Sequence, residues 1–338
     1  MSAPTGQAAA RPQHTGRGEP AITADGLVKK YGEVTALDGL TLTVAPGTVF
    51  GLLGPNGAGK STTIKILTTL SRPDSGTATV AGIDVLRRPN AVRSAIGVVT
   101  QRASTDPVAT GRENLLLAGR IHGMRGARVK ARADELLERF GLTEAANRVV
   151  RTYSGGMQRK LDVALGLVHR PHVLFLDEPT TGLDPEARSE MWAEIARLSA
   201  DERMTIMLTT HYLEEADQLA DRIAIVDRGR LVTEGTPEEL KSGLRGDAVV
   251  AELAPDADLS VARTAIERLG GIADVTLDGR AVRARVENGA GAVPAVLAAL
   301  EGAGVTALSI TVARPSLDDV YLRHTGRTFA AAEIGGSR

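Results

Sequence analysis

A glycine-rich turn that ends in a lysine and a serine is the segment whose residue types point most directly to chemistry. Glycines let backbone N–H groups close around phosphate oxygens, and a helix that begins there adds its positive end. The lysine reaches the β- and γ-phosphates of a nucleotide, and the serine hydroxyl takes Mg²⁺. The turn follows a predicted strand and opens a predicted helix, which is the context this pattern requires. The predicted nucleotide ligands are Gly54, Pro55, Asn56, Gly57, Ala58, Gly59, Lys60, Ser61 and Thr62.

Two adjacent carboxylates follow a short apolar run, Val173–Leu176, that predicts a buried strand. Because side chains alternate along an extended chain, we expect Asp177 to hold Mg²⁺ and Glu178 to face an attacking water. An acidic strand end or a helix N-cap is the simpler explanation of such a pair when it stands alone. The phosphate-binding turn upstream favours the catalytic interpretation.

Short apolar runs alternate with helical stretches around these residues, which predicts an α/β core of the P-loop NTPase (RecA-like) kind. The region from about residue 102 to 170 reads instead as amphipathic helices and predicts a helical insertion into that core. We expect the whole domain to span residues 21–240. The expected strands are Thr48–Leu53, Ile96–Thr100, Val173–Leu176, Thr205–Thr209 and Arg222–Val226, and the expected helices outside the insertion are Lys60–Leu70 and Pro185–Ser199.

A second, smaller domain is expected over residues 247–326. Its elements read in the order β-α-β-β-α-β, which is the plan of a small α+β ferredoxin-like domain. Asp278-Gly279 lies between the two middle strands, where a tight hairpin needs positive φ. Arg283 and Arg285 alternate with apolar residues, so we expect them on a solvated outer face. Residues 1–20 and 327–338 are expected to be disordered tails. The predicted elements are Ala248–Leu253, Leu259–Leu269, Ile272–Leu277, Ala281–Val286, Ala292–Glu301 and Val305–Val312.

The composition of the 338-residue chain excludes several classes of function. The formal net charge is −1 with acids and bases intermixed, so no basic field is present to recruit nucleic acid. The absence of cysteine excludes disulfides and thiolate metal sites. The longest apolar runs fall far short of the roughly 18–20 residues that a membrane-spanning helix needs.

The segment Tyr153-Ser-Gly-Gly-Met-Gln resembles the signature loop of ABC ATPases, and it lies after the helical insertion and about twenty residues before Asp177. It is a second glycine turn followed by a helix, and hence a second anion site without a lysine of its own. A serine N-cap with a glycine turn is the plain alternative for this segment alone. The resemblance implies that Ser154, Gly155 and Gly156 contact the γ-phosphate held by the opposite subunit of a head-to-tail dimer.

Four further residues match positions of that family in order along the chain. The resemblance implies that Tyr31 stacks on adenine, that Gln101 contacts Mg²⁺ and the attacking water, and that Asp184 crosses the dimer interface in the nucleotide site. It also implies that His211 senses the γ-phosphate. Each residue seen alone would be ascribed to packing or to the solvent-exposed surface. Together the matching positions cover residues of about 22–236.

Three segments narrow the resemblance to ATPases of the daunorubicin-resistance type. They are the signature loop with Tyr153 and Met157 in place of the common Leu and Gln, the stretch His211–Arg222, and the stretch Pro315–Gly326. Some members of that subfamily carry Gln where this chain has His211. The glycines of the loop are kept, so we expect phosphate binding to be kept as well.

The resemblance implies an ATPase with ATP and Mg²⁺ as ligands and metal contacts from Ser61, Gln101 and Asp177. Glu178 would activate the water and His211 would orient the γ-phosphate. The implied partners are a second ATPase subunit and an integral membrane permease at the cytoplasmic face of the membrane, through which a hydrophobic small molecule such as an antibiotic is exported. A non-transport ABC protein that acts on ribosomes or DNA is the alternative, but it lacks support from tandem modules, a coiled coil or basic stripes. An importer subunit with a regulatory C-terminal domain is a third possibility, disfavoured by the C-terminal plan.

Overall fold

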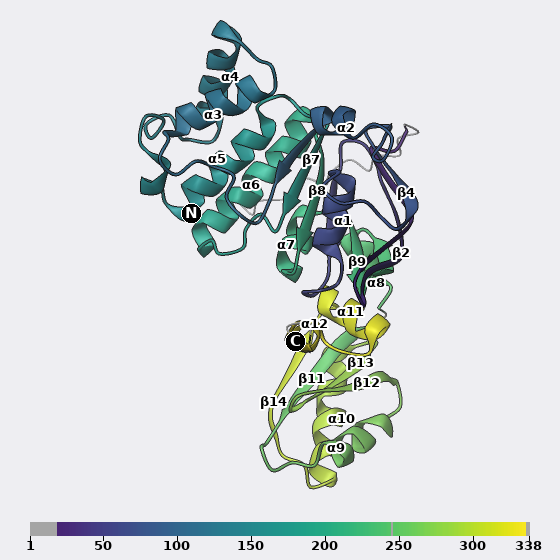
Figure 1. Cartoon of the computed structure of the whole chain (residues 1–338). Coiled ribbons are helices and arrows are strands. Elements are labelled where there is room, and N and C mark those ends of the chain that lie inside the picture. Colours follow the sequence, from purple (N-terminus) through teal and green to yellow (C-terminus); the bar gives the residue numbers. More distant parts are fainter. Residues whose placement is uncertain (1–18, 245, 336–338) are drawn as a thin grey trace.

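A six-stranded sheet forms the centre of the larger part of the molecule (Figure 1). The computed structural model describes residues 19–244 and 246–335. Apart from the antiparallel edge strand β10, the neighbouring strands pair in parallel. β3 and β8 are buried along their whole length, which explains why they read as continuous apolar runs. In spatial order the strands are β10 (Arg230–Gly235), β9 (Arg222–Asp227), β3 (Val49–Leu53), β8 (Thr205–Thr210), β7 (Val173–Asp177) and β6 (Ile96–Val99).

A second, antiparallel sheet packs beside the first and was not predicted from the sequence. Helix α1 (Lys60–Leu67) contributes Ile64, Ile66 and Leu67 to the hydrophobic cluster that joins the two sheets. The miss has a physical reason: only one face of this sheet is buried, and register shifts interrupt the alternation along β1. Its strands, in spatial order, are β2 (Val34–Val44), β1 (Ile22–Tyr31), β4 (Ser75–Val80) and β5 (Ile83–Asp84).

The remaining helices of this part lie between and after the strands of the central sheet. Helices α3, α4 and α5 occupy the region that was predicted to be helical, and α5 also packs on β6. The α/β fold with a helical insertion is therefore confirmed. The helices are α2 (Pro89–Ala95), α3 (Gly111–Ile121), α4 (Gly126–Arg139), a 3-10 turn at Val150–Thr152, α5 (Gly155–Leu167), α6 (Pro185–Glu202), α7 (Leu213–Leu219) and α8 (Pro237–Ser242).

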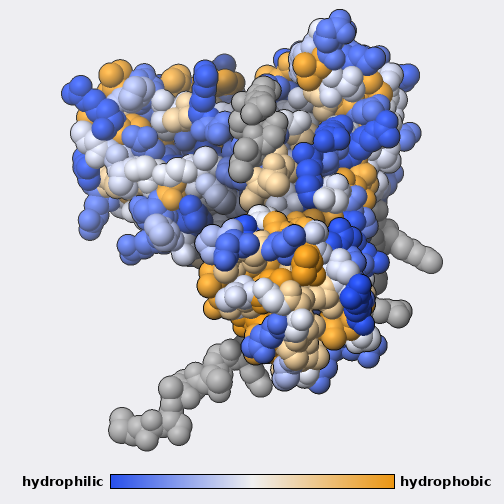
Figure 2. Space-filling model, turned by 90° about the horizontal axis from the view of Figure 1, so that it is seen from below, coloured by the Kyte–Doolittle hydropathy of each residue, from blue (hydrophilic) through white to orange (hydrophobic). Residues whose placement is uncertain are grey.

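The smaller part has the predicted β-α-β-β-α-β order and lies below the first in Figure 1. Its antiparallel sheet has the order β12-β13-β11-β14, and Gly279, with φ of 56°, turns the hairpin between β12 and β13. Seen from below, this part carries hydrophobic residues on its surface (Figure 2). Leu308, in β14, is 63% exposed. The elements are β11 (Asp247–Leu253), α9 (Leu259–Glu267), β12 (Ile272–Asp278), β13 (Ala281–Val286), α10 (Gly289–Gly302) and β14 (Ala307–Ala313).

The expectation of a solvated outer face on β13 of this smaller part was wrong. Arg283 and Arg285 do not lie on a solvated face, because both pair with Asp319 at the start of α11 (Leu317–Thr325). Arg285 is buried and its Nη2 atom lies 3.2 Å from Asp319 Oδ2. The two arginines that alternate with apolar residues along β13 therefore lie on a face of the strand that α11 covers.

The prediction of a disordered tail over residues 327–338 is also corrected. Residues Phe329–Gly335 form helix α12, and α11 and α12 lie between the two parts of the molecule (Figure 1). Phe329 is buried with its ring against the edge of Tyr321, at 5.0 Å between centroids. Both rings join a cluster with Leu53 and Ile223 of the central sheet. The tail expected over residues 1–20 lies outside the described residues apart from Glu19 and Pro20, which are exposed.

No helix in the described ranges combines the length and the apolar character that crossing a membrane requires.

Candidate functional site

The glycine-rich turn connects β3 to α1, as the sequence predicted. A side chain at Gly59, where φ is 105°, would meet the carbonyl oxygen of Ala36 at 2.6 Å. At Gly54 an added Cβ atom would lie 2.4 Å from the carbonyl oxygen of Val226. These two glycines are therefore required by close backbone contacts, and they let the turn wrap tightly at the start of the helix.

Lys60 folds back over the turn with a buried side chain. Its Nζ atom donates hydrogen bonds to the carbonyl oxygens of Gly54 at 2.7 Å and Pro55 at 3.1 Å. Burial lowers the pKa of Lys60, whereas the nearby carboxylates of Glu178 and Asp177 act in the opposite direction. An ammonium group in this place is suited to phosphate oxygens, because their charge compensates the desolvation of the lysine.

Ser61 and Asp177 come together across the start of α1 and the end of β7. The Ser61 hydroxyl lies 3.4 Å from Asp177 Oδ1, and the same oxygen accepts a hydrogen bond of 2.6 Å from the Thr209 hydroxyl. These are hard oxygen donors beside a phosphate-binding turn, and such donors fit Mg²⁺. Thr62, the next residue of α1, is half-buried. Thr209 was missed, although it stands in the strand predicted to neighbour this site.

Glu178 has a backbone φ of 49°, a left-handed conformation that is unfavourable for a residue with a side chain. Asp177 is the last residue of β7, so simple alternation along an extended chain was the wrong reason for expecting the two carboxylates to diverge. The turn of the backbone after Asp177 separates them. Strain of this kind at the end of a buried strand is typical of functional sites.

Four side chains surround the carboxylate of Glu178. His211 has the largest effect and lowers the pKa of Glu178, against the effect of burial, with further lowering by Lys60 and Thr181. The carboxylate is therefore ionised at neutral pH and able to accept a proton. The neighbours are His211 (Nδ1 to Oε1, 3.2 Å), Lys60 (Nζ to Oε1, 3.8 Å), Gln101 (Nε2 to Oε2, 3.3 Å) and Thr181 (Oγ1 to Oε2, 3.3 Å).

The second glycine turn forms the start of α5. Ser154 caps α5 by accepting a hydrogen bond of 3.2 Å from Met157 N, and Ser154 and Gly155 are exposed. Asp184 caps α6 in the same way, accepting a hydrogen bond of 2.8 Å from Ala187 N. A Cβ atom added to Gly156 would lie 3.0 Å from Ala187 Cβ, so the two turns are neighbours.

Tyr31 ends β1 with its ring 47% exposed. Its hydroxyl lies 3.4 Å from the Ser71 hydroxyl, and Lys29 Nζ lies 5.4 Å from the ring centroid. In the part of the chain that the structure describes, no hydrogen bond or ion pair joins Tyr31 or the second glycine turn to the cluster around Glu178. The structure thus brings Lys60, Ser61, Gln101, Asp177, Glu178 and His211 together beside the predicted glycine-rich turn, to which Lys60 is hydrogen-bonded. Five other predicted residues lie outside this group: Tyr31, Ser154, Gly155, Gly156 and Asp184.

Two family models match the chain. One, described as "ABC transporter", matches residues 37–181. The other, described as "ATP-binding protein DrrA1-3-like, C-terminal domain", matches residues 235–325. The two matches fall on the two parts of the fold.

Relatives extend over nearly the whole chain. The daunorubicin resistance ATP-binding protein DrrA3 of Streptomyces coeruleorubidus is 50% identical over 308 residues, which cover 91% of this chain and 96% of the relative. The linearmycin resistance ATP-binding protein LnrL of Bacillus subtilis (strain 168) is 36% identical over 311 residues, covering 91% of this chain and 99% of the relative.

Solved structures match the larger part. The ATP-binding cassette MJ0796, in a dimeric post-hydrolysis state with ADP and Pi, has a TM-score of 0.58 at 26% identity and covers 64% of this chain and 98% of its own. The cbiO1 protein from Clostridium perfringens has a TM-score of 0.62 at 25% identity and covers 74% of this chain and 96% of its own.

Proposed function

This chain belongs to the ATP-binding subunits of ABC transporters and is an ATPase, and from that premise we propose that it drives the export of hydrophobic small molecules by a separate membrane permease. The observation that carries the proposal is the 50% identity over 91% of the chain to a daunorubicin resistance protein. Similarity to a linearmycin resistance protein supports the same class of cargo. These relatives give no support to the alternative of a ribosome or DNA ATPase.

We assign the chemistry to the cluster around Glu178. Its ionised carboxylate accepts a proton from the water that attacks the γ-phosphorus as the bond from that phosphorus to the bridging oxygen of ADP breaks, which yields ADP and phosphate. Lys60 leaves its own loop carbonyls and neutralises phosphate charge. Gln101 and His211 hold the carboxylate in place from two sides. The contacts of these side chains thus already position them for the proposed roles.

Mg²⁺, when bound, neutralises charge on the β- and γ-phosphates, and Ser61, Asp177 and Gln101 are the residues that would hold it. Tyr31 offers an exposed ring on which adenine stacks. The remaining charge on the γ-phosphate would be met by Ser154, Gly155 and Gly156 of a second copy of the chain, with Asp184 beside them. We propose accordingly that two copies form a head-to-tail homodimer, which is attached at the cytoplasmic face of the membrane through the permease.

The transport proposal is tested in cells of the host that carry either the native chain or Glu178→Gln as their only copy. Daunorubicin is the probe, because its fluorescence reports its accumulation. Cells with the variant should retain more daunorubicin than cells with the native chain. Their growth should also stop at a lower concentration of daunorubicin. Equal accumulation in both strains would remove daunorubicin-like compounds from the proposed cargo.

A matched measurement on the purified chain separates transport from catalysis. Glu178→Gln should slow phosphate release by roughly 10²–10⁴-fold while ATP still binds, because a positioned general base contributes that much. Lys60→Ala should instead weaken ATP binding, since a charge-assisted contact is lost. Native turnover in Glu178→Gln would contradict the assigned base, whatever the cells show.

A further inference from the structure

Arg159 lies on the first turns of α5, and its buried guanidinium group makes four hydrogen bonds to backbone carbonyls. Nε donates to the carbonyl oxygen of Pro179 at 2.6 Å and Nη1 donates to that of Thr100 at 2.7 Å. Nη2 donates to the carbonyl oxygens of Asp177 and Glu178, each at 3.2 Å. One side chain therefore holds the backbone of three consecutive residues around the strained Glu178.

The Thr100 contact connects the same guanidinium to the loop that carries Gln101. One turn further along α5, Asp162 Oδ1 accepts a hydrogen bond of 2.8 Å from Ser104 N. The Asp162 carboxylate is buried. The loop is thus held before Gln101 by Arg159 and after it by Asp162.

The geometry of a guanidinium group explains why arginine suits this place. Its five N–H donors form a rigid planar fork, so it can hold carbonyls from separate segments at fixed angles, which a lysine ammonium cannot do. Left-handed backbone at a residue with a side chain persists only where its surroundings enforce it. At Glu178 this enforcement comes from Arg159 on one side and from the Thr209 hydroxyl, which accepts a hydrogen bond of 3.1 Å from Glu178 N, on the other.

We propose that Arg159 is a positioning residue for ATP hydrolysis, which sets the backbone of Glu178 and the Gln101 loop together and connects both to the helix that begins at the second glycine turn. The inference rests on the role assigned to Glu178. It predicts that a change at Arg159 acts on the rate of hydrolysis, because Arg159 touches neither the phosphate-binding turn nor Tyr31 through any hydrogen bond in the described residues.

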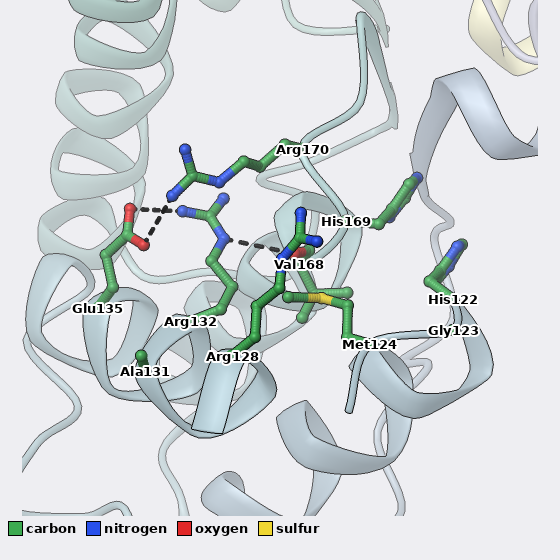
Figure 3. A pocket seen from close by; sticks show the side chains of 10 residues that line it. All are labelled: His122, Gly123, Met124, Arg128, Ala131, Arg132, Glu135, Val168, His169 and Arg170. Atoms are coloured by element: carbon green, nitrogen blue, oxygen red, sulfur yellow. Dashed lines mark hydrogen bonds and ion pairs between the residues drawn. The ribbon is translucent and has the colours of Figure 1, made fainter. Parts of the chain in front are cut away.

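Arg132, on α4, provides a matched control, because it contacts the opposite, C-terminal end of α5. It is as buried as Arg159, and it donates to the carbonyl oxygens of Leu167 at 2.7 Å and Val168 at 3.3 Å. Figure 3 shows it beside a cavity of about 410 Å³, where it also pairs with Glu135. Replacing Arg132 therefore removes a buried guanidinium from two carbonyls without reaching Glu178.

The experiment compares Arg159→Lys with Arg132→Lys in the full chain. We expect Arg159→Lys to lower kcat by roughly 10²-fold, the cost of a misplacement of about 1 Å at a reacting group. Its ADP affinity should stay within about threefold of native, because the phosphate-binding turn is intact. Arg132→Lys should lower the melting temperature and keep kcat. In Arg159→Ala, free guanidinium ion at non-denaturing concentration should restore part of kcat, whereas methylammonium should not.

If Arg159→Lys does not fold, Asp162→Leu takes its place and should lower kcat by loosening the Gln101 loop, again with native ADP affinity. Native kcat in a folded Arg159→Lys, or a loss of kcat equal to that of Arg132→Lys, would overturn the proposal. So would failure of guanidinium to rescue Arg159→Ala. Glu178→Gln is measured alongside: if it turns over normally, the role of Glu178 fails, whereas a slow Glu178→Gln with a native Arg159→Lys refutes only the role of Arg159.

Discussion

His211 places its Nδ1 atom 3.2 Å from Oε1 of Glu178, although His211 follows β8 and Glu178 follows β7. Both side chains are largely buried. The two atoms lie within ion-pair distance, although the His211 Nδ1 atom has no well-aligned hydrogen bond among the described residues. The contact is the largest cause of the lowered pKa of Glu178. Two loops far apart in the sequence thereby set the proton affinity of one carboxylate.

Replacing His211 by Gln should move the acidic limb of the ATPase pH profile to higher pH. The carboxylate must be ionised to accept a proton, and without His211 its pKa rises toward the ordinary value. Activity is then lost at a higher pH as the solution is acidified. Phosphate release measured from about pH 8 down to about pH 4 gives the limb, since carboxylates ordinarily titrate near the lower end of this pH range.

His122→Gln, far from Glu178 in the helical insertion, is the control and should leave the limb in place. An unmoved limb in His211→Gln would mean that His211 does not tune Glu178.

Tyr31→Ala should weaken ATP affinity by about 1–3 kcal/mol, the range found for stacking of a base on an aromatic ring. Tyr31→Phe is the matched control, because it keeps the ring and removes only the hydroxyl that lies 3.4 Å from Ser71. Calorimetry with ATP in both variants separates the two contributions. Native affinity in Tyr31→Ala would assign the exposed ring to the surface, and an equal loss in both variants would assign the effect to the Ser71 contact.

The sequence predicted the parallel strands of the central sheet and the order of the C-terminal elements because their apolar periods are regular, whereas the edge strand β10, which is mostly only partly buried, was missed. Lys60, Ser61, Asp177 and Glu178 were predicted from their own motifs, whereas Gln101 and His211 were predicted only through the family resemblance, and Thr181 was missed. The sequence could not show how Glu178 is oriented, because a left-handed backbone at a glutamate is enforced by Arg159 and Thr209 from elsewhere in the chain. The pairing of Arg285 with Asp319 was missed for the same reason. Contacts between distant segments leave no periodic signal in either segment.

Phe329→Ala should destabilise the chain by about 3–5 kcal/mol, the usual cost of removing a buried phenylalanine ring. Phe329 is 3% exposed and packs on Tyr321, so the variant leaves a cavity where α12 meets the central sheet. Urea unfolding measures the loss. Leu308→Ala removes an apolar side chain that is 63% exposed and should cost less than about 0.5 kcal/mol. A cost below about 1 kcal/mol for Phe329→Ala would show that α12 contributes little to the fold, in conflict with the burial of its first residue.

The last prediction concerns the second glycine turn, and the structure indicates which glycine to change. A Cβ atom at Gly156 would crowd Ala187 at 3.0 Å, whereas at Gly155 the nearest atom is Leu183 Cδ2 at 4.0 Å. Gly155→Asp therefore adds a carboxylate without strain in its own chain, and at the first position of α5 the negative charge favours the helix. Any loss of hydrolysis then comes from repulsion of the γ-phosphate that the partner holds. Gly155→Asn has nearly the same shape without the charge and should remain more active.

Two inactive variants should rescue each other if the site is shared between chains. When Lys60→Ala and Gly155→Asp chains are mixed, one composite site of the heterodimer carries both changes and the other carries neither. Part of the phosphate release should return, while each variant alone stays inactive. The chain has no cysteine, so in a mixture of Ser154→Cys and Asn56→Cys chains of different tag size, a disulfide between unlike chains joins these two positions and is told from either homodimer by its mass. A cross-link between chains in the presence of ATP, formed by Glu178→Gln subunits that hold the nucleotide, supports the head-to-tail dimer. If tagged heterodimers form, regain no activity and give no cross-link between chains, the second glycine turn does not complete the partner's site.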